Sequence, residues 1–250
     1  MKVVNKSTKE EVYNAPIIPW SNDSYTPISN RFIMDMLTDK IQNLGLTVKS
    51  EDYRTSLTKD GKIKGVIGGL NVITDNENYC QRIMFRNSYD KSMSFAIVIG
   101  TLVLICENGC VSGDYQYKRI HRGVITGDTS TTQEDIVENI NGSFQYLETA
   151  FTKVTGQLDE LKHFQISPKE SYELIGDLFF KQEVINITQM SIIKRELAQS
   201  NNFRHIDDAD FTAYDLYNHI TESLKSSSPY TYVKDHVTTH KLFKETFNLS

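Results

Sequence analysis

Apolar residues recur at steps of three and four along much of the chain, and this spacing predicts amphipathic helices. The first is expected over residues 30–44, with Ser29 or Asn30 as its N-cap and Gly45 at its C-terminal stop. Over residues 131–161 the spacing continues unbroken, which predicts one helix of about thirty residues with a single apolar seam. Further helices are expected from Ser167-Pro168 onward and over 185–199, 211–224 and 232–247.

Between the first two helices the period shortens to two, which predicts strands. The expected strands cover 48–57, 63–74, 79–85, 93–106 and a last segment near 115–120. Because every connection is short, we expect an antiparallel meander of about five strands. Gly65, Gly68 and Gly69 in the second of these strands predict a bulge or a close backbone approach. The fold class is therefore α+β, a meander packed by a long helix and a C-terminal helical half.

The polar N-terminal segment is expected to differ from the rest of the chain. Residues 1–28 are rich in Asn, Ser, Thr and Pro, which predicts an extended arm. We expect this arm to dock the only tryptophan, Trp20, onto the domain. Residues 29–250 predict a single α+β domain, with the first helix and the meander over 29–125 and the helical part over 131–250.

Composition and charge narrow the classes of function. The chain has 250 residues, of which 39% are hydrophobic and 24% charged, as in ordinary globular proteins. Its formal net charge of -5 gives no global attraction to nucleic acid or anionic membranes, so nucleic-acid contact requires a local basic patch. The N-terminus lacks an apolar leader, and the longest apolar run, 93–106, is too short to cross a bilayer. We expect a cytoplasmic protein with no membrane partner.

The sequence offers weak candidates for a metal or cofactor site. Cys80, Cys106 and Cys110 lack CxxC spacing and are expected to be buried free thiols. His236 and His240 stand four apart on an expected helix, but no third ligand stands at a suitable spacing. We therefore expect neither a metal nor a cofactor.

An acidic cluster allows two interpretations, a divalent-ion site or the capped start of a helix. It consists of Asp207, Asp208, Asp210 and Asp215. The helix start is the favoured interpretation. GxSxG, GxxxxGK[ST] and GxGxxG motifs are absent from the sequence, so whether the protein is an enzyme stays open, with the balance against it.

Hydrogen-bonding side chains are densest in the segment 86–92, Arg-Asn-Ser-Tyr-Asp-Lys-Ser, between two expected strands. Arg86 offers a planar fork for phosphate or carboxylate, to which Asn87 and Ser88 add hydrogen bonds. The alternative is a hairpin turn stiffened by an Arg86–Asp90 ion pair.

The densest basic cluster follows in the last expected strand. It comprises Lys118, Arg119, His121 and Arg122, preceded at strand spacing by Tyr115 and Tyr117. Aromatic rings that stack on bases, combined with cations that hold phosphates, are typical of single-strand nucleic-acid binding. The alternative is a solvated edge strand that charge protects from self-pairing.

Two segments resemble the DUF932 family, whose members are associated with phages and plasmids. The first comprises residues 86–92, the apolar strand, Cys106-Glu107-Asn108-Gly109 and His121-Arg122. The second, Thr212 to Glu222 (TAYDLYNHITE), is similar to a late helix of the family. Tyr89 stands where the family often has His, and Lys91 where it often has Gly.

The resemblance implies a genomic context more than a chemistry, because the family has no settled activity. We expect a phage or mobile-element protein in the cytoplasm of an infected bacterial host, binding single-stranded DNA in replication or recombination. We also expect the protein to form a homo-oligomer by self-association along the long helix. The phosphates would contact Arg86, Lys118, Arg119 and Arg122, and the bases would stack on Tyr115 and Tyr117. The alternatives are a module that binds a host or phage protein and, third, a metal-dependent enzyme at the acidic cluster.

Overall fold

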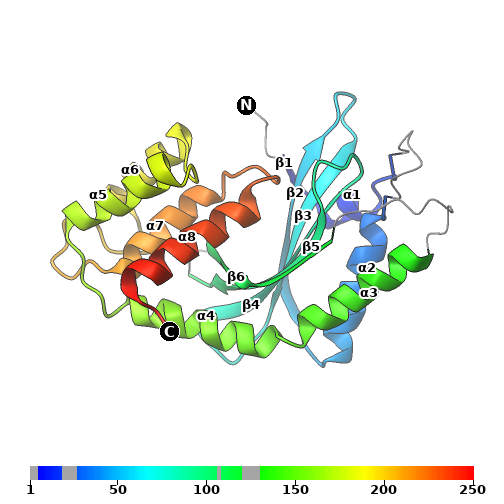
Figure 1. Cartoon of the computed structure of the whole chain (residues 1–250), viewed down its shortest axis with the longest axis horizontal. Helices are drawn as coiled ribbons and strands as arrows, with labels where there is room; N and C mark the ends of the chain where they lie inside the picture. The colour runs from blue at the N-terminus through cyan, green and yellow to red at the C-terminus, as the bar shows by residue number, and fades with distance from the viewer. Residues whose placement is uncertain (1–4, 19–26, 106–107, 120–129) are drawn as a thin grey trace.

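A computed structural model of the chain describes residues 5–18, 27–105, 108–119 and 130–250. At its centre lies a six-stranded antiparallel sheet in which each strand pairs with its neighbours in sequence (Figure 1). The strands are β1 (Asn5–Ser7), β2 (Val48–Leu57), β3 (Ile63–Val72), β4 (Tyr79–Ser88), β5 (Phe95–Val103) and β6 (Asn108–Arg119). The predicted five-stranded meander is confirmed as β2–β6, and β1 adds a short edge strand.

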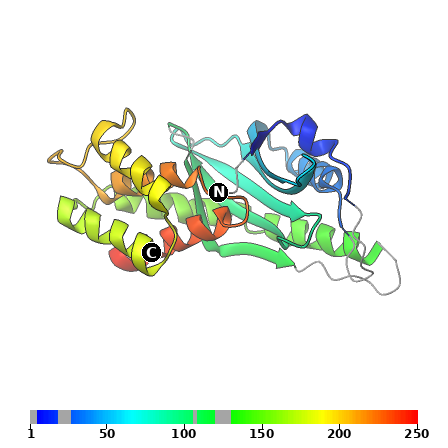
Figure 2. The same cartoon turned by 90° about the horizontal axis from the view of Figure 1, so that it is seen from above.

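Helices surround this sheet and form the C-terminal half of the chain, which confirms the α+β class. They are α1 (Lys9–Tyr13), α2 (Asn30–Asn43), α3 (Ser130–Phe144), α4 (Leu147–Leu161), α5 (Pro168–Gly176), the π-helical turn η1 (Asp177–Lys181), α6 (Ile187–Gln199), α7 (Ala213–Leu224) and α8 (Tyr232–Phe247). Helices α5–α8 lie at one end of the molecule, and α1 and α2 at the other (Figures 1 and 2). Within the described residues, no helix combines the length and apolar character that spanning a membrane requires.

The segment expected to be an extended arm contains both β1 and α1. Helix α1 starts with a capping box, in which Thr8 and Glu11 bond to each other's backbone nitrogen. Trp20, which was expected to dock this segment, lies outside the described residues.

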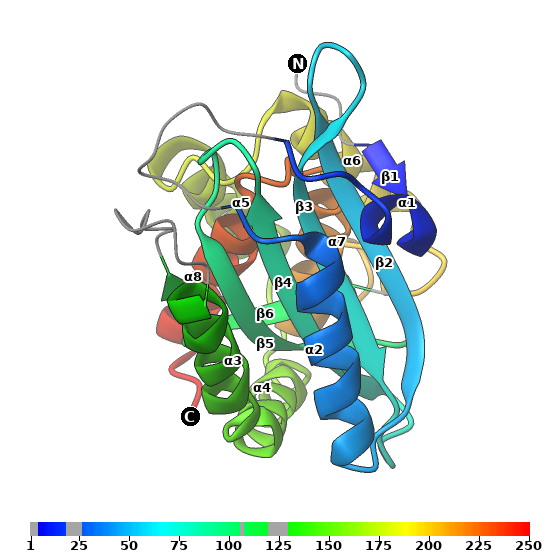
Figure 3. The ribbon, with the colours of Figure 1, turned by 90° about the vertical axis from the view of Figure 1, so that its right-hand side faces the viewer.

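The central strands β3–β5 are buried because helices pack on both faces of the sheet. On one face, Ile83 joins a core with α2, α3 and the start of α4. On the other face, Met84 and Val98 pack with Tyr232 and Val233 of α8. Figure 3 shows α2 and α3 in front of the sheet. Successive residues of a strand point to opposite faces of the sheet. Because both faces are covered here, the residues that point to either face are apolar, and the strands are nearly continuous hydrophobic runs.

The single helix predicted over 131–161 is wrong in its continuity. The structure has two helices, α3 and α4, separated at Gln145 and Tyr146. The backbone nitrogen of Tyr146 donates to the carbonyl of Ser143 at 3.2 Å, which closes a tight turn in place of the helical ladder. Asn141-Gly142-Ser143 directly precede the break, and all three residue types are poor helix formers.

The apolar seam nevertheless continues across this break and joins two cores. Leu147 and Ala150 of α4 pack in the core beneath the sheet, whereas Val154, Leu158 and Leu161 belong to the core of the helical half. Helix α4 therefore ties the sheet to α5–α8. Because these seam residues are buried inside the chain, they form no surface on which a second copy can pack, and any self-association would use other residues.

Two glycines in β3 confirm the predicted close approach. A Cβ atom on Gly68 would lie 2.7 Å from Cζ of Phe85, and one on Gly69 would lie 2.6 Å from Cζ of Arg82. These positions therefore require glycine because neighbouring side chains lie flat on the strand.

We predict that Gly68→Ala lowers the free energy of unfolding by about 1–3 kcal/mol, because its methyl group overlaps the buried Phe85 ring. The matched control is Gly156→Ala in α4, where nothing lies within 4 Å of the new methyl group. That change should raise the free energy of unfolding by about 0.5–1 kcal/mol. Denaturant titration measures both, and equal effects of the two substitutions would contradict the close packing at Gly68.

Candidate functional site

The polar segment 86–92 begins within a strand, because Arg86, Asn87 and Ser88 are the last residues of β4. The guanidinium of Arg86 donates through Nε to the Ser94 carbonyl at 3.1 Å and through Nη2 to Ser94 Oγ at 2.7 Å. Burial lowers the pKa of Arg86. The alternative Arg86–Asp90 ion pair is wrong, since the Asp90 carboxylate instead pairs with Lys64 at 3.1 Å.

Asn87 and Ser88 are buried, with structural hydrogen bonds. Asn87 Nδ2 donates to Asn30 Oδ1 at 2.9 Å, and the Tyr89 hydroxyl accepts from the backbone nitrogen of Asn30 at 3.0 Å. Ser88 Oγ bonds both the backbone nitrogen and the carbonyl of Met93. This segment therefore clamps the start of α2 to the sheet, and of the three proposed ligands in it only Arg86 is not fully buried.

The second predicted cluster lies on the edge strand β6, of which the backbone is described. Lys118 pairs with Ala96 of β5, and Tyr117 pairs with Ile97. Tyr115 and Arg119 belong to the same strand. His121 and Arg122 lie outside the described residues.

The strand register brings Arg86 and Lys118 into one row across the sheet. The row, called here the basic row, consists from β1 to β6 of Lys6, Arg54, Ile67, Arg86, Ala96 and Lys118. Residues paired in this way occupy the same face of a sheet. Lys6 and Arg54 were not singled out from the sequence, because no local pattern shows that β1 pairs with β2 in this register.

The β1–β2 end of the basic row borders a hollow of about 360 Å³ between the sheet and α8. Lys6, Arg54, Arg82 and Lys225 line it together with Asp52 and Tyr232, and we call it the basic hollow. Arg82 is 3% exposed, and its Nη1 lies 2.7 Å from Asp52 Oδ2. Although burial opposes ionisation of Asp52, the charge of Arg82 holds the pKa of that carboxyl below its usual range.

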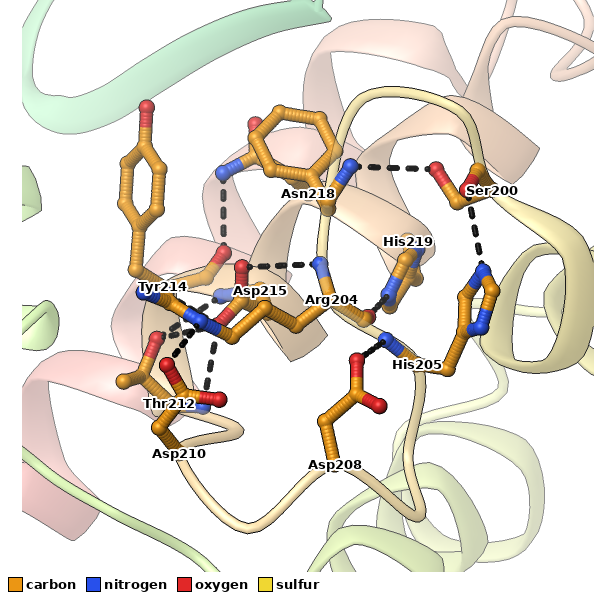
Figure 4. Close-up of polar contacts among 11 residues, drawn as sticks. Ser200, Arg204, His205, Asp208, Asp210, Thr212, Tyr214, Asp215, Asn218 and His219 are labelled. Atoms are coloured by element: carbon orange, nitrogen blue, oxygen red, sulfur yellow. Dashed lines mark hydrogen bonds and ion pairs between the residues drawn. The ribbon is translucent and has the colours of Figure 1, made fainter.

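The acidic cluster surrounds a different arginine, Arg204 (Figure 4). Its Nε lies 2.7 Å from Asp210 Oδ2, and its Nη1 lies 3.5 Å from Asp215 Oδ2. Asp215 also accepts from the backbone nitrogen of Thr212 at 3.0 Å and forms the capping box of α7 with that residue. The helix-start interpretation is confirmed for Asp215, which forms the capping box of α7 with the N-cap residue Thr212. Among the described residues, no group of three His, Cys, Asp or Glu is arranged to hold a metal.

A wide depression of about 730 Å³ opens beside Arg204 and also contains Lys162 and Tyr214. Its cations are already paired, Arg204 with Asp210 and Lys162 with Asp159 at 2.6 Å. This depression therefore offers little unbalanced positive charge to an anion.

His219 of α7 supports the Arg204 loop from within. Its Nε2 donates to the Arg204 carbonyl at 2.8 Å, and its ring stacks on Phe211 at 5.9 Å and meets Phe203 edge-on. Burial lowers the pKa of His219. The neighbouring Asn218 accepts at its carbonyl from Asn108 Nδ2 at 2.9 Å, which joins the two segments that resemble DUF932.

The other titratable candidates are part of the protein interior. His236 and His240 are buried on α8, and His240 Nε2 lies 2.9 Å from Gln157 Oε1. Cys80 is a buried free thiol whose pKa is raised by burial. The side chains of Cys106 and Cys110 lie outside the described part of the structure.

We predict that His219 makes stability depend on pH. Its folded-state pKa lies below the ordinary value of 6.5, so the unfolded chain takes up a proton first as the pH falls. Its contribution is therefore present above about pH 6.5 and is lost progressively below that value. His219→Gln retains an N–H donor for the Arg204 carbonyl but does not titrate.

Denaturant titrations at about pH 7.5 and about pH 5.5 test this expectation. The wild type should lose more stability between the two pH values than His219→Gln does. The control is His163→Gln, at an exposed position, which should behave like the wild type. Equal losses in all three proteins would show that His219 is not responsible.

The comparisons with known proteins agree with the resemblance found in the sequence. The sequence model of one family, described as "Domain of unknown function (DUF932)", matches residues 20–245. No curated protein and no solved structure matches the chain. The matched range contains strands β2–β6 and both segments that resemble the family. The chain belongs to the DUF932 family.

Proposed function

We propose that this protein binds single-stranded nucleic acid, most simply DNA, in the replication or recombination of a phage or another mobile element. The observation that carries the proposal is the basic row, in which four of six register positions across the sheet are Lys or Arg. The net charge of -5 makes such a local concentration of cations necessary for any phosphate contact.

Burial divides the basic row into two ends. Ile67 and Ala96 are buried, which separates Lys6 and Arg54 at the β1–β2 end from the register position of Lys118 on β6. Neighbouring strands lie about 4.8 Å apart, so five spacings separate these ends by about 24 Å. This length corresponds to about four nucleotides of an extended strand, within the range of known single-strand sites.

The two ends have different complements of side chains. The β1–β2 end borders the basic hollow, whereas at the β6 end Lys118 belongs to the row and Tyr115, Tyr117 and Arg119 occupy alternate positions of the same edge strand, on the opposite face. A bound strand would reach the tyrosines from the row by passing over the β6 edge. Tyrosines suit base stacking and do not require a particular sequence. The proposal thus assigns phosphate contacts to both ends of the row and base contacts to β6. His121 and Arg122 continue the same basic segment in the sequence.

We predict that the wild type binds a fluorescent oligonucleotide of about twenty thymidines, with affinity that falls steeply as salt rises. Lys118→Ala with Arg119→Ala should weaken binding at least about tenfold and reduce the dependence on salt, because phosphate contacts are lost. Fluorescence anisotropy at several salt concentrations measures both quantities.

The control is Lys169→Ala with Lys241→Ala, which removes two exposed cations of the helical half, on α5 and α8. Its affinity should match that of the wild type. No binding at about 50 mM salt, or equal weakening by both double variants, would reject the basic row as a nucleic-acid surface.

A second candidate function is protein binding, which one observation favours. The consecutive elements α5, η1 and α6 expose the large apolar side chains Tyr172, Phe180 and Ile187. Large exposed apolar side chains are typical of protein interfaces where they form one patch, and consecutive elements can bring these three together. A host or phage protein retained from a nuclease-treated lysate by the wild type, but not by Phe180→Ser, would support this function in place of nucleic-acid binding.

A further inference from the structure

We propose that the basic hollow is a binding site for a phosphate monoester, such as the phosphate of a mononucleotide or the phosphorylated end of a strand. The hollow is built from the β1–β4 face of the sheet and is closed on one side by Lys225 and Tyr232, at the end of α7 and the start of α8. The inference does not depend on the proposed function, because a free phosphate ester satisfies the same groups.

The carboxylates that line the hollow already have partners. Asp52 pairs with Arg82 at 2.7 Å. Glu51 pairs with Lys9 at 2.8 Å and also accepts from the Tyr53 hydroxyl at 2.5 Å. The negative charges of Asp52 and Glu51 are therefore balanced by neighbouring cations before any ligand enters.

The cations are not equally compensated. Lys225 lies 2.7 Å from Glu222. Within the part of the chain that the structure describes, neither Lys6 nor Arg54 forms an ion pair. The hollow therefore retains an excess of positive charge, because Asp52 also faces Arg82, and this excess favours an anionic ligand.

Arg54 provides the most direct sign of a ligand. Its Cζ lies 4.4 Å from the centroid of the Tyr232 ring, which holds the guanidinium beside the hollow. Its Nη1 is buried and has no hydrogen-bond partner among the residues that the structure describes. A buried donor without an acceptor costs free energy, and a ligand oxygen at this position would remove the cost.

Arg82 forms a rigid floor beside it. Its guanidinium lies against Gly69 and donates through Nη1 to Asn71 Oδ1 at 2.6 Å and through Nη2 to Asp52 Oδ1 at 2.9 Å. These bonds fix Arg82 before a ligand binds, and its buried Nε also lacks a partner in the described part of the chain. Preorganised guanidinium groups of this kind favour anion binding, because less conformational entropy is lost on association.

The size and charge of the site favour phosphate over a carboxylate. A volume of about 360 Å³ lies at the lower end of the range for small-molecule sites and admits a phosphate with an attached sugar. A phosphate monoester carries nearly two negative charges and three acceptor oxygens, which match the charges of Lys6 and Arg54. A carboxylate brings one charge and two oxygens, and leaves one cation uncompensated.

The test measures thermal unfolding and calorimetric titration with inorganic phosphate and with adenosine monophosphate, against acetate at equal ionic strength. Both phosphates should raise the midpoint of thermal unfolding of the wild type, because a ligand that binds only the folded state stabilises it. Acetate should have no such effect. Arg54→Met should bind both phosphates at least about tenfold more weakly, because a charge-assisted hydrogen bond is lost.

The matched control is Arg31→Met. Arg31 also stacks on a tyrosine, with its Cζ 4.8 Å from the Tyr13 ring, but its side chain is 64% exposed and lies outside the hollow. The Arg31→Met variant should bind phosphate as the wild type does. Without phosphate, Arg54→Met should unfold at a temperature equal to or above that of the wild type, because it removes an unsatisfied donor and keeps the aliphatic stem on Tyr232.

Three outcomes would overturn the inference: no stabilisation by either phosphate, equal stabilisation by acetate, or equal binding by Arg54→Met and Arg31→Met. Comparing a 5′-phosphorylated with an unphosphorylated oligonucleotide then separates the two sources of phosphate. Loss of oligonucleotide binding with retained phosphate binding would reject the proposed function and leave this inference intact.

Discussion

The arrangement of the molecule depends on how the second face of the sheet is covered. One face packs against α2, α3 and the start of α4, but α8 covers the other face only from β6 to Ile67 of β3 and leaves the β1–β2 end open. Beyond α8, polar groups close to the strands must satisfy one another, because water reaches them only in part. Arg82, Asp52 and Asn71 form such a group, and Gly69 leaves the space in which the guanidinium lies.

This incomplete cover accounts for the position of the basic hollow. A buried guanidinium requires a carboxylate partner, and the resulting Arg82–Asp52 pair forms the floor of the basic hollow. Arg54 stands at the margin of α8, where its plane rests on Tyr232 but one of its donors is unsatisfied. The wider depression at Arg204 lacks this imbalance, since Asp210 and Asp215 compensate its arginine. Charge balance, more than cavity size, distinguishes the two.

The predictability of each feature follows from the range of the interactions behind it. Local signals located α2, with its Ser29 cap and Gly45 stop, because both act within one turn of helix. The break between α3 and α4 was missed because the apolar seam runs through it unchanged. For the candidate site, Arg86 and Lys118 were identified from local density of polar residues, yet Arg54, Arg82 and Arg204 were not. The partners of Arg54 and Arg82, Tyr232 and Asp52, are distant in sequence, and no local pattern shows them. Arg204 pairs with acids close to it in sequence, but only the acids were singled out there.

The sequence by itself determined the order of the main elements from α2 onward, apart from the α3–α4 break, and the meander that they contain, because periodicity and short turns act over a few residues. Tertiary structure decided what the polar residues do. It turned Asn87 and Ser88 into internal clamps, placed Lys6 and Arg54 in one row with Arg86, and buried Arg82 against Asp52. Pairing register and helix cover set the surroundings of each charge, and these arise only when distant segments meet.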